Sequence, residues 1–256
     1  MKRSTALHVT IVVMLIVVIA LVSILVAKKP CTCVTPAPFV PLHAPTTSLT
    51  STSLTSEIRG WYKQTQSRGS TISLMPADTN TIVFVSGKAF VSHALDALSA
   101  NVLDRSFINF LGLGGSTEDG MLTRDSLLVA GNPVYLNMIR TRGFNGICFD
   151  MQGVTPGLDF NSVFQTCKQA NFQVMVIPSA SVNVQAMVKN SNIDIISPRL
   201  YTGTSLDLNP QGLQLSTYRG AKPKIVPTII DVNQYSTIHS YFNMQGIQWN
   251  GYFVAF

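Results

Sequence analysis

The sequence predicts an α/β domain built on a parallel sheet between residues 57 and 256. Short apolar runs alternate with amphipathic stretches, a pattern typical of βα units. The hydrophobic fraction of 46% in 256 residues is enough for a packed core. Eight strands are expected, at residues 58–63, 81–86, 107–112, 146–152, 173–177, 193–197, 225–230 and 251–256.

Helical stripes are expected between these strands, at residues 95–102, 160–167 and 238–242. About 200 residues with eight strands suit a compact (β/α)₈ barrel of the TIM type, in which functional residues lie at the carboxyl ends of the strands. An open, doubly wound sheet is the alternative. It lacks support, because no G-x-G-x-x-G or G-x-x-x-x-G-K-[ST] loop joins a strand to a helix.

Three segments are expected to precede the barrel domain: a basic tail at 1–5, a transmembrane signal anchor at 6–27 and a stalk at 28–56. The anchor segment carries no formal charge over 22 residues and is long enough, as a helix, to cross a bilayer. It ends in Lys28 and Lys29 rather than in small residues, which favours an uncleaved anchor over a cleaved signal peptide. The stalk is rich in Pro, Ser and Thr, a composition that cannot bury a core.

The net charge of +6 does not indicate a nucleic-acid partner. All twelve acidic residues lie at or beyond residue 57 together with fourteen of the eighteen Lys and Arg, so the domain carries only +2. The other four charges, on Lys2, Arg3, Lys28 and Lys29, flank the apolar segment. With the α-amino group the amino-terminal side has one charge more, which favours a single-pass protein with its N-terminus inside and its domain outside or lumenal. A virion envelope is one such setting, and the oligomeric state stays open.

The four cysteines form two groups. Cys31 and Cys33, beside the membrane segment, could be acylated, could link two chains or could stay unmodified. Cys167 shares a helical stripe with apolar residues and is expected in the core. No metal is expected, because the histidines lack the H-E-x-x-H spacing, and no cofactor is implied. The G-x-S-x-G motif of a serine nucleophile is also absent.

Residues 143–153 are the most informative run in the chain. The two-residue period of a strand sends Cys148, Asp150 and Gln152 to one face and the apolar residues between them to the other. In a barrel the polar set points inwards. A buried carboxyl is costly unless it is hydrogen-bonded, so Asp150 is expected either in a site or in a structural tie between strands.

Motif spacing in two of these strands is distinctive. Residues 145–152 read N-G-I-C-F-D-M-Q, and residues 107–115 end in Gly112, Leu113, Gly114 and Gly115. They resemble, in this order, the D-G-x-D-x-D-x-E and S-x-G-G motifs of glycoside hydrolase family 18, the chitinase and chitinase-like (β/α)₈ barrels, with Gly112 in the Ser position.

Two later strands extend the resemblance over nearly all of residues 57–256. Residues 193–201 are similar to the family's sixth-strand segment ending in M-x-Y, with Tyr201 kept and Arg199 in place of Met. Residues 251–256 resemble G-x-x-x-x-W, with Phe256 in place of the sugar-stacking Trp. The resemblance implies a degenerate site formed by Asn145, Cys148, Asp150, Gln152 and Tyr201.

The departures from the family pattern bear on activity. In the family the Glu protonates the glycosidic oxygen while the substrate's own N-acetyl group attacks, steadied by the middle Asp and the Tyr. Gln152 stands in the Glu position, and an amide has no transferable acid proton near neutral pH. Cys148 removes the carboxylate partner of Asp150. A carboxylate from Glu118, Asp119 or Asp207 could substitute, but nothing in the sequence places one there.

Three functions follow from this pattern. The first is a membrane-tethered, catalytically inactive chitinase-like barrel that binds an N-acetylglucosamine-containing glycan or a protein partner at its rim. The second is a glycosidase with a relocated acid, and the third is a purely structural surface or envelope protein. Trp61 and Tyr235 are further aromatic candidates for sugar stacking. Candidate ligand-binding residues are Asp150, Gln152, Tyr201, Gly114, Gly115, Trp249 and Phe256.

Overall fold

The computed structural model describes residues 57–64, 75–98, 103–180, 182–208 and 214–255. The chain divides into two compact units, 1–52 and 53–256, and the second holds all of these residues. The expected anchor at 6–27, the stalk at 28–56, and the residues Cys31, Cys33 and Phe256 lie outside them. Within the described ranges no helix has both the length and the apolar character that crossing a bilayer requires.

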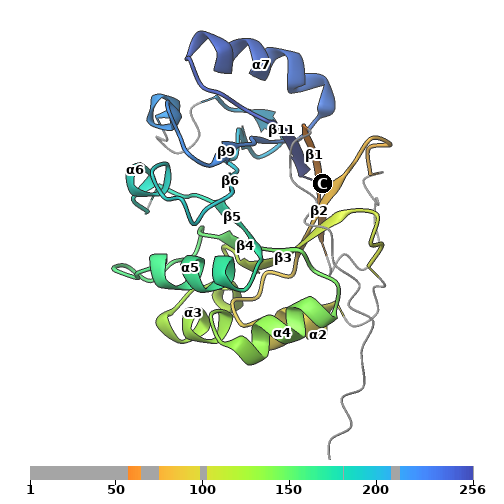
Figure 1. Ribbon diagram of the computed structural model, residues 1–256. Coiled ribbons are helices and arrows are strands. Elements are labelled where there is room, and N and C mark those ends of the chain that lie inside the picture. The colour runs from red at the N-terminus through yellow and green to blue at the C-terminus, as the bar shows by residue number, and fades with distance from the viewer. Residues whose placement is uncertain (1–56, 65–74, 99–102, 181, 209–213, 256) are drawn as a thin grey trace, which may run out of the picture. The chain divides into compact units, whose positions relative to one another are not determined.

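Parallel strands form a ring (Figure 1). The sheet order is β10-β11-β1-β2-β3-β4-β5-β6-β9. Its two outer members are consecutive in the chain: β9 pairs with β6 and β10 pairs with β11, so one segment joins both edges of the sheet. The strands are β1 (Ile58–Gln64), β2 (Thr81–Val85), β3 (Ile108–Gly114), β4 (Gly146–Asp150), β5 (Gln173–Ile177), β6 (Ile195–Ile196), β9 (Lys224–Ile225), β10 (Thr228–Ile229) and β11 (Gly251–Ala255). The α/β, TIM-like architecture is therefore confirmed, in place of an open doubly wound sheet.

Helices cover the ring unevenly. The helical elements are α2 (Val91–Ala97), α3 (Arg124–Ala130), α4 (Pro133–Thr141), α5 (Asn161–Gln169), α6 (Val184–Met187) and α7 (Tyr235–Met244), with the 3₁₀ turns η1 (Glu118–Gly120), η3 (Leu215–Tyr218) and η4 (Val232–Gln234). A short hairpin of β7 (Tyr201–Thr202) and β8 (Ser205–Leu206) follows β6. Among the described residues no helix follows β1, and only η3 lies between the hairpin and β9, so this barrel has fewer helices than strands.

Local sequence explains where two of the helices begin. Thr123 accepts a hydrogen bond from the Ser126 N–H and the Ser126 hydroxyl accepts one from the Thr123 N–H, a capping box ahead of α3. The Asn132 side chain caps α4, which has Pro133 in its first turn. Both caps satisfy backbone N–H groups that would otherwise lack partners.

Two apolar layers hold the fold together. One fills the inside of the ring, and the other lies between the strands and the helices and includes the buried Cys167, as expected. The alternation predicted for β4 is confirmed, because Cys148 belongs to the inner layer and Phe149 to the outer one. Glycines make room for rings inside: a Cβ on Gly60 would lie 2.0 Å from the Phe253 ring. The interior is therefore packed rather than open.

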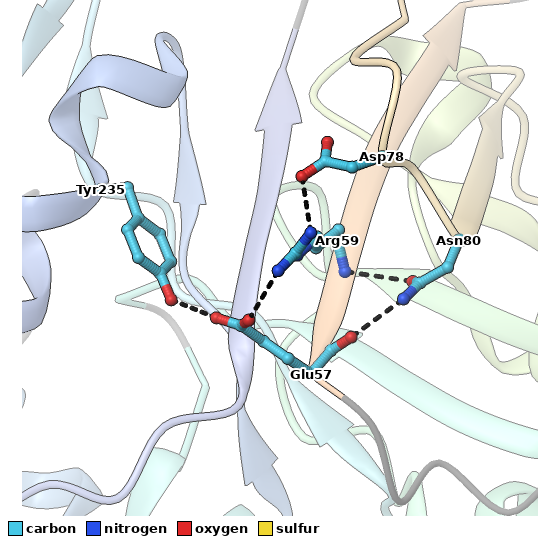
Figure 2. A network of polar contacts seen from close by, with 5 residues as sticks. All are labelled: Glu57, Arg59, Asp78, Asn80 and Tyr235. Carbon is cyan, nitrogen blue, oxygen red and sulfur yellow. Dashed lines mark hydrogen bonds and ion pairs between the residues drawn. The ribbon is translucent and has the colours of Figure 1, made fainter.

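A polar network ties the amino-terminal end of β1 to its neighbours (Figure 2). Arg59 forms ion pairs with Asp78 at 2.9 Å and with Glu57 at 3.3 Å, and Tyr235 donates its hydroxyl hydrogen to Glu57. Asn80 donates to the Glu57 carbonyl at 2.9 Å. Burial, followed by the bond to Glu57, raises the pKa of Tyr235 to about 12. The chain thus enters the barrel at a fixed point, at the amino ends of the strands.

Candidate functional site

A pocket of about 340 Å³ lies at the carboxyl ends of the strands, and we call it the mouth pocket. Five of the residues expected in a site line it: Gly114, Gly115, Asp150, Gln152 and Tyr201. The described residues that line it are Gln64, Val85, Ser86, Gly87, Gly114, Gly115, Ser116, Thr117, Asp150, Gln152, Arg199 and Tyr201. The site therefore sits at the end of the barrel where strand order and direction place function.

Asp150 is the last residue of β4, and its side chain is only 7% exposed. Its Oδ2 accepts a hydrogen bond from Nη2 of Arg199 at 2.7 Å, and its Oδ1 accepts the N–H of Gln152 at 3.2 Å. Burial raises the pKa of Asp150, while the charge of Arg199 and the Gln152 N–H act in the opposite direction. The buried carboxyl therefore has a charged partner inside the protein.

Arg199 is the site residue that the sequence motif did not identify. It stands where the resembling family has Met, and its guanidinium reaches across the mouth from the segment after β6. One signal could have revealed it. Ser197, Arg199 and Tyr201 are spaced by two residues, so an extended chain places all three on the inner side with Asp150, and a buried carboxyl calls for a cation.

Cys148 lies two residues before Asp150 on the same inward face and is 1% exposed. Burial, and then the neighbouring Asp150, raises the pKa of Cys148 well above its usual value. The thiol is therefore protonated at neutral pH. It supplies no negative charge to the mouth, whereas a carboxyl at this position could share a proton with Asp150.

A buried cluster of three hydroxyl groups lies deeper in the barrel than the mouth-lining Gln64. The Tyr62 hydroxyl lies 3.4 Å from Ser197 Oγ and 3.3 Å from Thr228 Oγ1, and these two oxygens are 2.7 Å apart. Burial raises the pKa of Tyr62 well above its usual value, so the phenol keeps its proton. Its members are Tyr62 of β1, Ser197 directly after β6 and Thr228 of β10, which are far apart in the chain and share no sequence motif.

Tyr201 and Gln152 are both half-buried at the mouth. Burial raises the pKa of Tyr201, so its hydroxyl is a neutral hydrogen-bond donor and acceptor at neutral pH. Gly114 closes the pocket between β3 and β4. Its φ is +100°, and a Cβ there would lie 2.2 Å from the carbonyl oxygen of Asp150. Glycine is needed at this position because the two strands approach so closely.

Other expected residues lie elsewhere. Asn145 precedes β4 at the opposite end of the barrel, where its Oδ1 accepts the N–H of Asn109 at 2.9 Å. Trp249 precedes β11 at that same end and packs against Tyr235, with 5.0 Å between ring centroids. Trp61 packs against the outer apolar layer. The structure therefore does not bring these residues to the mouth pocket.

No acid from the candidate loops lines the mouth pocket. Glu118 and Asp119 lie on the exposed turn η1, where Asp119 pairs with Lys88 at 2.6 Å. Asp207 accepts the hydroxyl hydrogen of Thr202 at 2.7 Å. Asp150 is the one carboxyl among the lining residues that the structure describes, and over those same ranges no three His, Cys, Asp or Glu side chains group as metal ligands would.

Comparison with known proteins gives a fold likeness and no family. No protein-family model and no curated protein matches the chain. Among solved structures it is similar to a family GH18 chitinase from Chromobacterium violaceum, with a TM-score of 0.49, 12% identity and 78% of each chain covered. It is also similar to a putative chitinase A from Streptomyces coelicolor, with a TM-score of 0.40, 13% identity, 69% of this chain and 76% of that one covered.

Proposed function

We propose that this chain is a membrane-tethered, catalytically inactive barrel whose mouth pocket binds the end of an N-acetylglucosamine-containing glycan. One observation carries the proposal. Among the described residues that line the pocket, Asp150 is the one carboxyl, and Arg199 already holds it in an ion pair of 2.7 Å. A pocket so arranged can form hydrogen bonds to a sugar, but it lacks the groups that would break a glycosidic bond.

A glycosidic oxygen leaves readily only when an acid protonates it, and such catalysis is worth about 10² to 10⁴-fold. Gln152 stands where the resembling family has this acid, and an amide can donate a hydrogen bond without releasing a proton. Asp150 is not free to take over this role, because Nη2 of Arg199 already binds its Oδ2 at 2.7 Å.

The mouth pocket is lined mainly by neutral residues, several of them polar. Gln64, Ser116, Gln152 and Tyr201 line the pocket with amide and hydroxyl groups, and the charges of Asp150 and Arg199 cancel. Such a lining suits an uncharged polyhydroxyl ligand better than a phosphate or a polyanion. The volume of about 340 Å³ is near the lower end for small-molecule sites, so a terminal sugar fits better than an extended chain.

The point where the chain enters the barrel is compatible with a membrane tether at the amino-terminal side of the domain. Glu57 follows the expected stalk and is fixed at the amino ends of the strands, whereas the mouth pocket lies at their carboxyl ends. A tether attached there leaves the pocket at the far end of the domain from its attachment. The transmembrane anchor at 6–27 and an outward-facing domain, on a cell or a virion, belong to this same proposal.

Calorimetric titration of the full chain with the N-acetylglucosamine tetramer tests the proposal, in a detergent without a sugar headgroup. We expect saturable binding that Gln152→Ala and Tyr201→Phe each weaken by about fivefold or more, since each removes a hydrogen bond worth on the order of 1 kcal/mol. Gln165→Ala, on the exposed side of α5, is the matched control and should bind as the unchanged chain does. Absence of binding would overturn the glycan proposal and favour a purely structural barrel.

A second arm tests the inactivity. Gln152→Glu restores the carboxyl of the family motif but leaves Cys148 and the Arg199–Asp150 pair in place. We therefore expect no release of reducing ends by this variant or by the unchanged chain. Release by the unchanged chain that disappears in Asp150→Asn would instead show an active glycosidase.

A further inference from the structure

A second pocket lies at the other end of the barrel, beside the carboxyl end of α7. Its volume is about 540 Å³. It is lined by Asn243, Gly246, Ile247, Gln248, Trp249 and Asn250, and we call it the Trp249 pocket. Of the lining residues that the structure describes, none carries a charge and none also lines the mouth pocket.

The indole of Trp249 is held in place by three rings of α7. Its centroid lies 5.0 Å from those of Tyr235 and His239 and 6.0 Å from that of Phe242. Rings at these separations pack favourably, and here they fix a half-buried tryptophan at the surface. The platform is therefore formed before any ligand arrives, which lowers the entropy cost of binding.

The backbone around the indole is equally fixed. The Gly246 N–H bonds to the Asn243 carbonyl at 3.0 Å, and the Asn250 N–H bonds to the Ile225 carbonyl at 2.9 Å. Gly246 has φ +66°, and a Cβ there would meet no atom within 4 Å. This turn therefore places Asn243, Gln248 and Asn250 around the indole while leaving open space beside the glycine.

This combination of groups has a clear chemical preference. We propose that the Trp249 pocket is a separate binding site for a neutral oligosaccharide, in which the C–H face of a sugar ring stacks on the indole. The amides of Gln248 and Asn250 can each donate and accept, as neighbouring hydroxyl groups of a sugar require. The Asn243 amide contacts His239 Nε2 through its Nδ2 at 3.0 Å and offers its Oδ1 as an acceptor. The absence of charge in the lining disfavours phosphate-bearing and polyanionic ligands.

The inference does not rest on the function proposed for the mouth. The two pockets lie at opposite ends of the strands and share no residue, so substitutions can disable each one alone. A chain with both sites can hold two sugar chains, or two parts of one surface, at the same time. Such bivalence raises the overall avidity for a glycan-coated surface without any new contact.

Tryptophan fluorescence gives a direct test, because the chain contains only two tryptophans. In Trp61→Phe the emission comes from Trp249 alone. The full chain with this change is titrated separately with the tetramers of N-acetylglucosamine, cellulose and starch, up to on the order of 10 mM. We expect a saturable change with at least one sugar, about tenfold weaker in Gln248→Ala and unaltered in Gln165→Ala.

Gln152→Ala combined with Tyr201→Phe separates the two sites. If the midpoint of the fluorescence titration is unchanged with both substitutions, the signal reports the Trp249 pocket. If the midpoint rises by about tenfold or more, the signal comes from the mouth and the inference is overturned. No change with any of the three sugars overturns it as well. Should Trp61→Phe fail to fold, calorimetry on Gln152→Ala with Tyr201→Phe replaces it: binding must remain there and must be lost on adding Trp249→Ala.

Discussion

Replacing Arg199 by Met, the residue type of the resembling family, should destabilise the barrel strongly at neutral pH. Removing one partner of a fully buried ion pair costs about 3 to 5 kcal/mol, because the other charge is left without compensation. Asp150 is 7% exposed and Arg199 is 25% exposed, so water partly reaches the pair. We therefore expect the lower end, a loss of about 3 kcal/mol in the free energy of unfolding at pH 7.

The same variant should show a distinct pH dependence. Burial already raises the pKa of Asp150, and removal of Arg199 raises it further. Below the pKa of about 4 that Asp has in the unfolded chain, the carboxyl is neutral in both states and adds no penalty. As the pH rises towards the folded-state pKa, the unfolded chain releases its proton first and stability is lost. The deficit of Arg199→Met should thus grow between pH 4 and 7.

Urea unfolding of the full chain at pH 4, 5, 6 and 7, followed by circular dichroism, measures this deficit. Arg199→Met with Asp150→Asn should recover much of the loss at pH 7, because the unpaired charge is gone. Lys88→Met is the control. It breaks an ion pair of similar length, 2.6 Å to Asp119, but the Asp119 side chain is 70% exposed, so the free energy of unfolding should change little. A deficit below about 1 kcal/mol at pH 7, or one that does not vary with pH, would refute the reasoning.

Two further predictions concern close packing and buried thiols. Gly114→Ala should cost about 1 to 3 kcal/mol more than Gly157→Ala in urea unfolding, because both have positive φ but only at Gly114 would the Cβ meet backbone, at 2.2 Å. Equal costs would show that the β3 and β4 ends can move apart. Cys148 and Cys167 should resist a thiol reagent at pH 8 until the chain is unfolded in urea, since both are buried and burial raises the pKa of Cys167 to about 12. Labelling of either thiol in the folded protein, located by peptide mass mapping, would contradict this placement.

The sequence predicted the positions of most strands and the orientation of β4, because both depend on local periodicity. The single strand expected at 225–230 was wrong, since it is divided into β9 and β10, and the β7–β8 hairpin was not predicted. Alternation alone placed Cys148, Asp150 and Gln152 on the inner side. The resemblance to the family motifs added Tyr201 and Gly114, which line the same pocket as Asp150. Trp249 was also predicted to bind ligand beside these residues, although it lies before β11 rather than after a strand. In a parallel barrel a residue before a strand lies at the opposite end from a residue after one, so topology alone could have separated it.

Other parts of the site depend on register and could not be predicted. The hydroxyl cluster joins Tyr62 to Ser197 and Thr228, which are 135 and 166 residues further along the chain. The contact depends on how far each strand is shifted along its neighbours, and single-sequence periodicity carries no such information. The helix expected through Val102 is described only as far as Ala97, and residues 99–102 lie outside the described ranges.

The central claim is that the mouth pocket binds sugar without cleaving it, and incorporation of ¹⁸O tests it most directly. The full chain is incubated with the N-acetylglucosamine tetramer in H₂¹⁸O, and mass spectrometry follows the label in shorter oligomers. Each hydrolysis event adds one labelled oxygen to a new reducing end. Because Arg199 holds Asp150 and Gln152 replaces the acid, we predict that the unchanged chain forms no more labelled product than Asp150→Asn does. Labelled product that forms with the unchanged chain and disappears in Asp150→Asn would contradict it.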